Sequence, residues 1–128
     1  MTANQLTRIY LAYISCLNSH NLAGLGQYVH ERASHNGRQL GLAGYREMLE
    51  NDFQGIPDLK FDVQLLVAEP PRIASRLQFS CAPRGEFLGL PVNGKHVSFT
   101  ENVFYEFEDR KILQVWSVID KLAIEKQL

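Results

Sequence analysis

The residue with the clearest chemical potential is Asp120, which ends an alternating stretch near the C-terminus. Residues 112–120 read ILQVWSVID. In an extended strand, side chains two positions apart share a face, so Asp120 is predicted to lie beside Trp116 and Val118. A carboxylate among apolar side chains loses hydration, which raises its pKa toward neutrality and suits it to take and return a proton. Asp120 is therefore the predicted acid–base group, with Trp116 and Val118 as its neighbours in a pocket.

The preceding strand supplies a second carboxylate, Glu101. A two-residue turn at positions 109–110 would align the two strands of the final hairpin. The predicted pocket face of this hairpin is then Phe99, Glu101, Val103, Tyr105, Gln114, Trp116, Val118 and Asp120. A one-residue bulge in the first of these strands would replace Glu101 by Asn102 on this face, whereas Asp120 would keep its place in either register.

Asp120 also has a purely structural interpretation. Aspartate is a favoured N-cap residue, and residues 121–127 are predicted to form a short terminal helix. The carboxylate would then accept hydrogen bonds from the first amides of that helix. On the residues alone, this interpretation is stronger than catalysis.

The elements that position these groups follow from changes in the hydrophobic period. Apolar residues recur every three or four positions in residues 3–19 and 42–53, which predicts two helices, and Asn21 is a predicted cap for a short helix between them. From residue 59 onward the period is two, which predicts strands. Helices followed by antiparallel strands indicate an α+β fold, in which the N-terminal helices pack on one face of a curved antiparallel sheet and can enclose a pocket against it. We interpret Tyr13 and Phe53 as helix residues that belong both to the core and to the pocket wall.

Length, charge and composition limit the kinds of partner. The 128 residues fit one domain, residues 1–128, and the net charge of −1 offers no surface for nucleic acid or an anionic membrane. No segment approaches the roughly 20 apolar residues of a membrane span, and the N-terminus does not read as a secretion signal. We therefore expect a soluble cytoplasmic protein with no nucleic-acid or membrane partner.

Metal and cofactor chemistry find little support in the sequence. The two cysteines, Cys16 and Cys81, have no metal-binding or redox spacing and are interpreted as buried thiols. The scattered histidines lack the spacing of a zinc site. The glycine-rich segment 85–95 has no GK[ST] ending and opens no helix, so it is not a phosphate loop. We interpret it as an apolar flap over the pocket mouth or as part of a dimer contact.

Several segments together resemble a known family. They are YLAYISCLNSHNLAGL at 10–25, GLAGYR at 41–46, IPDL at 56–59, GEFLGLPVNGK at 85–95 and the stretch from Phe107 through Trp116 to Asp120. In this order, and over nearly all of the chain, they resemble the SnoaL-like polyketide cyclases, which are part of the nuclear-transport-factor-two-like superfamily together with ketosteroid isomerases.

The resemblance implies an α+β cone with a deep apolar pocket, commonly in a homodimer, and acid–base chemistry without a metal or cofactor. The catalytic aspartate of the family corresponds to Asp120, which makes catalysis the favoured interpretation of this residue. The carboxylate would remove a proton from a carbon between carbonyl groups, the enolate would attack another carbonyl in the same molecule, and the acid would protonate the new oxygen. The expected partner is thus an apolar, carbonyl-containing small molecule. The alternatives are a binding protein that uses the pocket without chemistry and a dimerising scaffold.

The chain departs from the family pattern at two places near the pocket. The residue before Trp116 is often histidine in relatives and is Val115 here, and the common His-Gly pair appears as His35-Asn36-Gly37. His35 is still predicted to offer a hydrogen bond to a substrate oxygen. The other face of the final hairpin is also predicted to be apolar, with Phe104, Leu113, Val115 and Ile119, and a second copy of the chain is the simplest cover for it.

Overall fold

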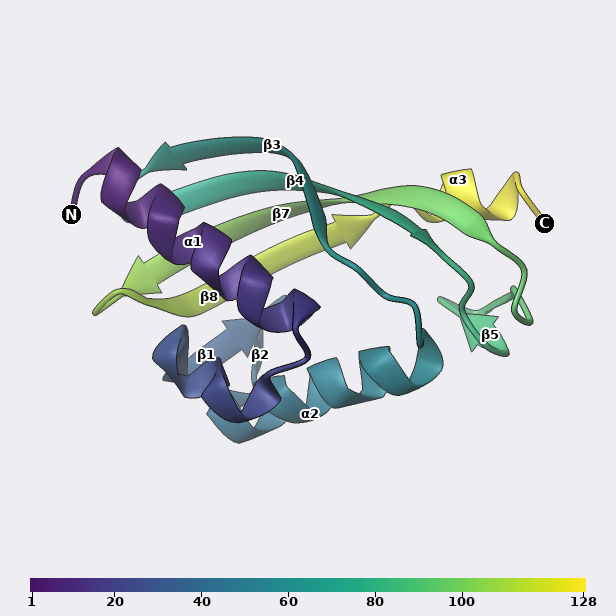
Figure 1. Ribbon diagram of the computed structural model, residues 1–128, viewed down its shortest axis with the longest axis horizontal. Helices are drawn as coiled ribbons and strands as arrows, with labels where there is room; N and C mark the ends of the chain where they lie inside the picture. The colour runs from purple at the N-terminus through teal and green to yellow at the C-terminus, as the bar shows by residue number, and fades with distance from the viewer.

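The computed structural model describes all of residues 1–128, and its centre is a six-stranded curved sheet with helices on one side (Figure 1). The strands are β1 (Val29–His35), β2 (Arg38–Gln39), β3 (Asp62–Glu69), β4 (Arg72–Cys81), β7 (Val97–Glu108) and β8 (Lys111–Ile119). Their order across the sheet is β2-β1-β8-β7-β4-β3. A separate two-stranded hairpin consists of β5 (Glu86–Phe87) and β6 (Leu90–Pro91).

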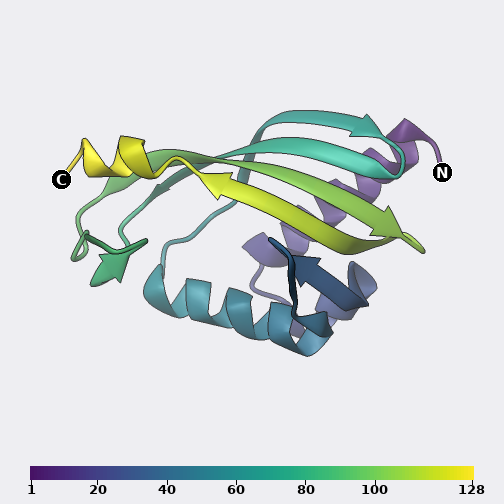
Figure 2. The same ribbon diagram turned by 180° about the vertical axis from the view of Figure 1, so that it is seen from behind.

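The helices are α1 (Ala3–Asn18), the 3₁₀ helix η1 (Leu22–Gln27), α2 (Gly41–Gly55) and α3 (Lys121–Glu125). Thr2 and Gln5 form a capping box at the start of α1, since each side chain bonds the other residue's backbone amide. Seen from both sides, α1 crosses one face of the sheet and α2 lies beyond β1, while α3 sits at the far end next to the C-terminus (Figures 1 and 2). None of these helices has the length and apolar character needed to cross a membrane.

One apolar core fills the space between helices and sheet. The buried face of α1 contributes Leu6, Tyr10, Tyr13 and Leu17, which pack against inward side chains of β4, β7 and β8. These α1 positions follow the three- and four-residue spacing of an amphipathic helix. The predicted helices, the later strands and the α+β class are therefore confirmed.

The sheet is not wholly antiparallel, which corrects one prediction. Residues 29–39, for which no strand was predicted, form the β1–β2 hairpin, and β1 pairs with β8 in parallel. This short strand has no clean alternation of apolar residues, so its pairing comes from tertiary contacts. The pairing matters for the site because it brings His35 beside Val115.

The final hairpin has the predicted turn and a different register. Asp109 and Arg110 both have positive φ, 52° and 63°, as a two-residue type I′ turn requires. Phe107 lies opposite Ile112, as a two-residue turn at positions 109–110 requires. The next pair is Glu106 with Gln114, so one extra residue of β8 interrupts the ladder.

This bulge reverses the face of the rest of β8. Beyond it, Val115 lies opposite Tyr105 and Ile119 lies opposite Glu101. The prediction that Trp116, Val118 and Asp120 share the pocket face, and that Val115 and Ile119 lie on the outer face, is therefore wrong. The physical reason is that Ile112 and Val115 are both buried although they are three positions apart, which a regular alternation cannot achieve.

Candidate active site

A cavity of about 630 Å³ lies between the helices and the inner face of the sheet. This volume falls in the range of small-molecule pockets. Thirteen of its 19 lining residues are hydrophobic, and they come from the helices, the sheet and the β5–β6 hairpin. Phe87 and Leu88 of that hairpin border the cavity, so the segment 85–95 occupies the flap position that was one of its two predicted roles.

Glu101 is the most enclosed carboxylate of the cavity. It extends from the middle of β7, and its neighbour across the ladder is Ile119. Burial raises the pKa of Glu101 to about 7; a hydrogen bond with Ser117 lowers it and the negative charge of Asp52 raises it further. A carboxyl group with such a pKa can hold or release a proton near neutrality, as general acid–base catalysis requires.

Asp52 extends from α2 to the rim of the same cavity. Its side chain remains accessible to solvent, yet the surrounding protein raises its pKa to about 6 through loss of hydration. Lys121, the first residue of α3, also lines the cavity. The charged residues that line the cavity are thus two acidic ones, Glu101 and Asp52, and one basic one, Lys121.

His35 and Ser117 form a polar pair beside Glu101. The Nε2 atom of His35 lies 3.3 Å from the Ser117 hydroxyl oxygen. Asn36 fixes the backbone of Ser117, because its side-chain oxygen accepts the Ser117 N–H at 2.8 Å and its amide donates to the Ser117 carbonyl at 3.2 Å. Partial burial and the charge of Arg38 lower the pKa of His35, so its ring is neutral near pH 7. A neutral ring in this place can donate or accept one hydrogen bond.

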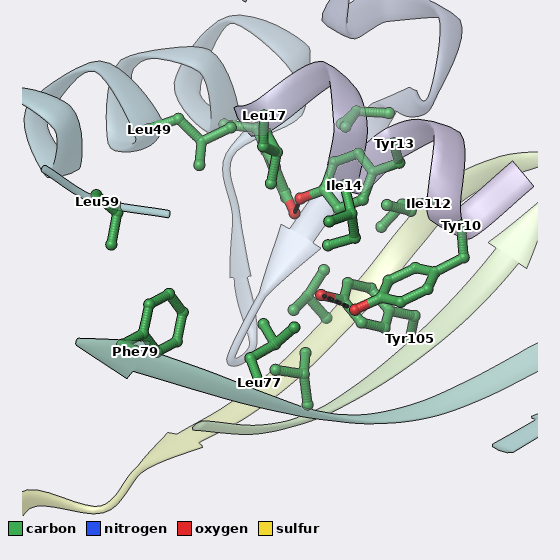
Figure 3. Packing of buried hydrophobic residues seen from close by; sticks show 14 of the residues in the cluster. Tyr10, Tyr13, Ile14, Leu17, Leu49, Leu59, Leu77, Phe79, Tyr105 and Ile112 are labelled. Carbon is green, nitrogen blue, oxygen red and sulfur yellow. Dashed lines mark hydrogen bonds between the residues drawn. The ribbon is translucent and has the colours of Figure 1, made fainter. Parts of the chain in front are cut away.

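Tyr13, Tyr45 and Tyr105 line the cavity, and Tyr10 packs against Tyr13 and Tyr105. Figure 3 shows Tyr10, Tyr13 and Tyr105 close together between α1 and the sheet. The hydroxyl groups of Tyr13 and Tyr45 are 2.7 Å apart. The Tyr10 hydroxyl donates to the Ser75 hydroxyl oxygen at 2.8 Å and lies 3.3 Å from the Tyr105 hydroxyl oxygen. Burial raises the pKa of each of these tyrosines, so all of them are neutral donors. Two hydroxyls share one hydrogen bond in the Tyr13–Tyr45 pair, which leaves one proton for a ligand oxygen.

Four of the predicted site residues are brought together. Tyr13, His35 and Glu101 line the cavity, and Val118 borders its edge. Sequence reasoning missed Asp52 and Tyr45, although a signal existed: the two residues are seven positions apart on one predicted helix, so they share a face, and an acidic residue on a face with a buried tyrosine is unusual.

Asp120, Trp116 and Phe53 do not line the cavity, and Val118 reaches only its edge. Asp120 is exposed and caps α3, where its carboxylate accepts the Ala123 N–H at 3.1 Å. Trp116 points outward with 42% of its surface exposed, and Val118 borders the cavity edge but is 72% exposed. Phe53 does not line the cavity; its ring packs against His20, with centroids 4.0 Å apart. The predicted placement of Asp120 in an apolar pocket is therefore wrong, because the bulge in β8 turns that end of the strand over.

One cluster outside the cavity has the residue types of a metal site: His30, Glu108 and Asp109. Its hydrogen bonds do not suit metal binding. The Nδ1 atom of His30 accepts the Arg32 N–H at 3.0 Å, so the ring proton sits on Nε2, which faces Glu108 at 3.2 Å. Arg32 binds the same carboxylate at 3.0 Å. Neither ring nitrogen offers a free lone pair to an ion.

The comparisons with known proteins agree with this architecture. The family model described as SnoaL-like polyketide cyclase matches residues 7–128. Among solved structures, a SnoaL-like polyketide cyclase from Agrobacterium tumefaciens is 51% identical, with a TM-score of 0.95 over 99% of this chain and 98% of that one. TsrD from Streptomyces laurentii is 22% identical and shares the fold, with a TM-score of 0.85 over 99% of this chain and 96% of that chain. Comparison with functionally curated proteins gave no match.

The curved, unclosed sheet with its helices is the nuclear-transport-factor-two-like fold. Within that fold class, the chain belongs to the SnoaL-like polyketide cyclase family.

Proposed function

We propose that this protein is an acid–base catalyst that acts on a small, mostly apolar carbonyl compound, and that Glu101 carries the proton. The observation behind the proposal is a half-buried carboxyl group, with its pKa raised to about 7, inside a largely apolar cavity. A carbon flanked by two carbonyl groups is acidic enough for such a base, and a pocket of this size brings distant parts of a flexible substrate together.

The proposed reaction moves one proton and forms one carbon–carbon bond. The Glu101 carboxylate takes the proton from the acidic carbon, and the bonding electrons move onto the adjacent carbonyl oxygen to give an enolate. The enolate carbon then attacks a second carbonyl of the same molecule, and protonated Glu101 delivers its proton to the resulting alkoxide. No electrons are gained or lost overall, so these steps consume no redox cofactor.

The neighbouring donors suit the charge that develops on oxygen. His35 is neutral and beside Ser117, and the Tyr13–Tyr45 pair retains one hydroxyl proton. Such donors, fixed before the substrate binds, stabilise an enolate oxygen more than a neutral carbonyl. Asp120 has no place in this scheme, because its carboxylate is exposed and already caps α3.

A matched pair of variants tests the assignment. The probe is 3-methylpentane-2,4-dione, and the measurement is exchange of its acidic C–H for deuterium in D₂O, followed by NMR. We expect Glu101→Gln to slow the protein-catalysed exchange by a factor of about 10²–10⁴ and Asp120→Asn to keep it within a few-fold. Full activity of Glu101→Gln, or an equal loss in a folded Asp120→Asn variant, would contradict the proposal. Binding of the probe without any exchange in the unmodified protein would instead support the ligand-binding alternative.

We also propose that two copies of the chain associate through the outer face of the sheet. Val67, Ala74, Phe104 and Trp116 are consecutive partners across β3, β4, β7 and β8, so they form one continuous apolar row. Phe104 is 60% exposed. Leu65 and Val118 are exposed at the two ends of the adjacent row, whose middle members are Arg76 and Asn102. An exposed apolar row of this kind typically marks an association surface, and a two-fold contact would cover both copies at once.

A further inference from the structure

A narrow apolar compartment of about 70 Å³ opens beside Glu101. It shares Glu101, Asp52, Phe61, Phe87 and Ile119 with the main cavity, so the two spaces meet at the candidate acid–base group. Its remaining walls are all apolar: Ile56, Leu59, Phe79 and Phe99.

Four phenylalanine rings fix the shape of this compartment. The rings of Phe79 and Phe99 are stacked, with centroids 5.3 Å apart and planes inclined by 22°. Phe61 meets Phe79 edge-on at 5.3 Å, and Phe87 of the β5–β6 hairpin lies 5.6 Å from Phe99. Figure 3 shows Phe79 reaching from β4 toward Leu59, which follows α2. Because the rings hold one another in place, they give the compartment a defined depth.

The walls determine what can occupy the space. Protein cores are packed nearly as densely as organic crystals, so a space of this kind next to a reactive carboxyl group is a candidate ligand subsite. Apart from the two carboxyl groups at its entrance, the walls offer no hydrogen-bonding side chain, and a water molecule in it would have few partners. An apolar group fits these walls. The volume is roughly half of the ~150 Å³ that accommodates a benzene ring, so it fits a short alkyl chain rather than an aromatic ring.

We propose that this compartment binds a short, unbranched alkyl substituent of the substrate, carried on or next to the carbon whose proton Glu101 removes. Phe79 and Phe99 then act as specificity-determining residues that limit the length of this substituent to about three carbons. This inference rests on the proposed function of Glu101, but it concerns binding and can be tested without turnover.

The test measures dissociation constants, by NMR titration, for 3-methyl-, 3-propyl- and 3-hexylpentane-2,4-dione. We expect the propyl compound to bind roughly tenfold more tightly than the methyl compound, because two further CH₂ groups become buried. The hexyl compound should bind no more tightly than the propyl compound. A steady gain from methyl through propyl to hexyl would overturn the proposal, since it would place the chain in the open cavity.

Two variants change the compartment in opposite directions. Ile56→Phe adds a ring to its wall and should reduce propyl binding to the level of methyl binding, whereas Phe99→Leu enlarges it and should make hexyl the preferred probe. Phe104→Leu is the matched control, because the same change on the same strand lies on the outer face. Unchanged preferences in both Ile56→Phe and Phe99→Leu would overturn the proposal.

Failure of this inference and failure of the proposed function are distinguishable. Glu101→Gln should retain the preference for propyl while it loses catalysed exchange. If exchange depends on Glu101 but chain length has no effect, only the alkyl subsite is refuted. If chain length has the predicted effect but Glu101→Gln remains fully active, only the catalytic role is refuted.

Discussion

The Glu101 carboxyl group lies where its charged form is poorly hydrated, so ionising it lowers the free energy of unfolding. Its pKa is raised from 4.5 to about 7, so the folded state binds more protons than the unfolded state between these two pH values. The folded state therefore gains stability from the protonated Glu101 carboxyl group. This contribution is fully present below pH 4.5 and is lost as the pH rises through 7. A group used for proton transfer thus reduces stability at the pH where it works.

Glu101→Gln should remove this pH dependence. We expect the variant to gain about 2 kcal/mol in free energy of unfolding, relative to the unmodified protein, between pH 4 and pH 8; partial exposure keeps the gain below the full value of the pKa shift. Urea unfolding of both proteins at several pH values measures the difference, in which the contributions of other groups such as Asp52 cancel. Parallel stability curves over this range would show that the carboxyl group titrates as an ordinary glutamate.

Asp120 should matter for stability alone. Its carboxylate bonds the Ala123 amide at the start of α3. Loss of an N-cap typically costs about 1 kcal/mol, so we expect Asp120→Ala to lower the free energy of unfolding by this amount and to leave catalysed proton exchange unchanged. Asp120→Asn, which can still cap, should lose much less stability. If an Asp120 variant kept normal stability but no longer catalysed exchange, Asp120 would have to be a residue of the active site.

At the scale of single elements, the bulge in β8 decides which residues reach the cavity. Val115 is buried opposite Tyr105, whereas Val118, three positions later, is 72% exposed. Without the extra residue, the strand would direct Trp116 inward and Val115 outward.

Alanine substitutions report on this register. Val115→Ala should cost about 2 kcal/mol, because two buried methyl groups are lost and a cavity remains. Val118→Ala should cost little when unfolding is measured at a concentration where the protein is monomeric. The reverse order of the two costs would mean that β8 follows an uninterrupted alternation.

The sequence was sufficient to predict the helices, the later strands and the turn at Asp109-Arg110, because each depends on local periodicity or on backbone preferences within a few residues. It was not sufficient to predict the bulge, which allows Ile112 and Val115 to be buried in the core together although they are three positions apart. The Glu101 prediction survived since β7 has no bulge, and the Asp120 prediction failed because it assumed regular pairing in β8. Asp52 and Tyr45 line the cavity because of the way α2 packs against the sheet, and local sequence patterns do not determine this packing.

At the scale of the whole molecule, the cavity and the apolar outer row lie on opposite faces of the same sheet. The cavity is enclosed by the helices, and the row through Phe104 faces away from them. Association of two copies through that row would therefore cover the face opposite Glu101, and Val118 is the residue at the cavity edge that lies nearest to the contact. Assembly and catalysis should be separable.

Phe104→Arg should separate them. A guanidinium group in the middle of the row would be desolvated without a partner in the dimer, so we expect this variant to sediment as a monomer at concentrations where the unmodified protein is dimeric. Its catalysed proton exchange per chain should remain within a few-fold of normal. A monomeric unmodified protein at high concentration would refute the dimer, and a folded Phe104→Arg monomer without exchange would show that the cavity needs the partner.

Titration of the Glu101 carboxyl group itself tests most sharply whether Glu101 carries the proton. In protein labelled with ¹³C at glutamate carboxyl groups, NMR should show one signal that titrates near pH 7 and is missing from Glu101→Gln, and addition of 3-propylpentane-2,4-dione should shift this signal. If every glutamate carboxyl group titrates between about pH 4 and 5, and the diketone leaves the Glu101 signal unchanged, the account of Glu101 as the proton-carrying group is contradicted.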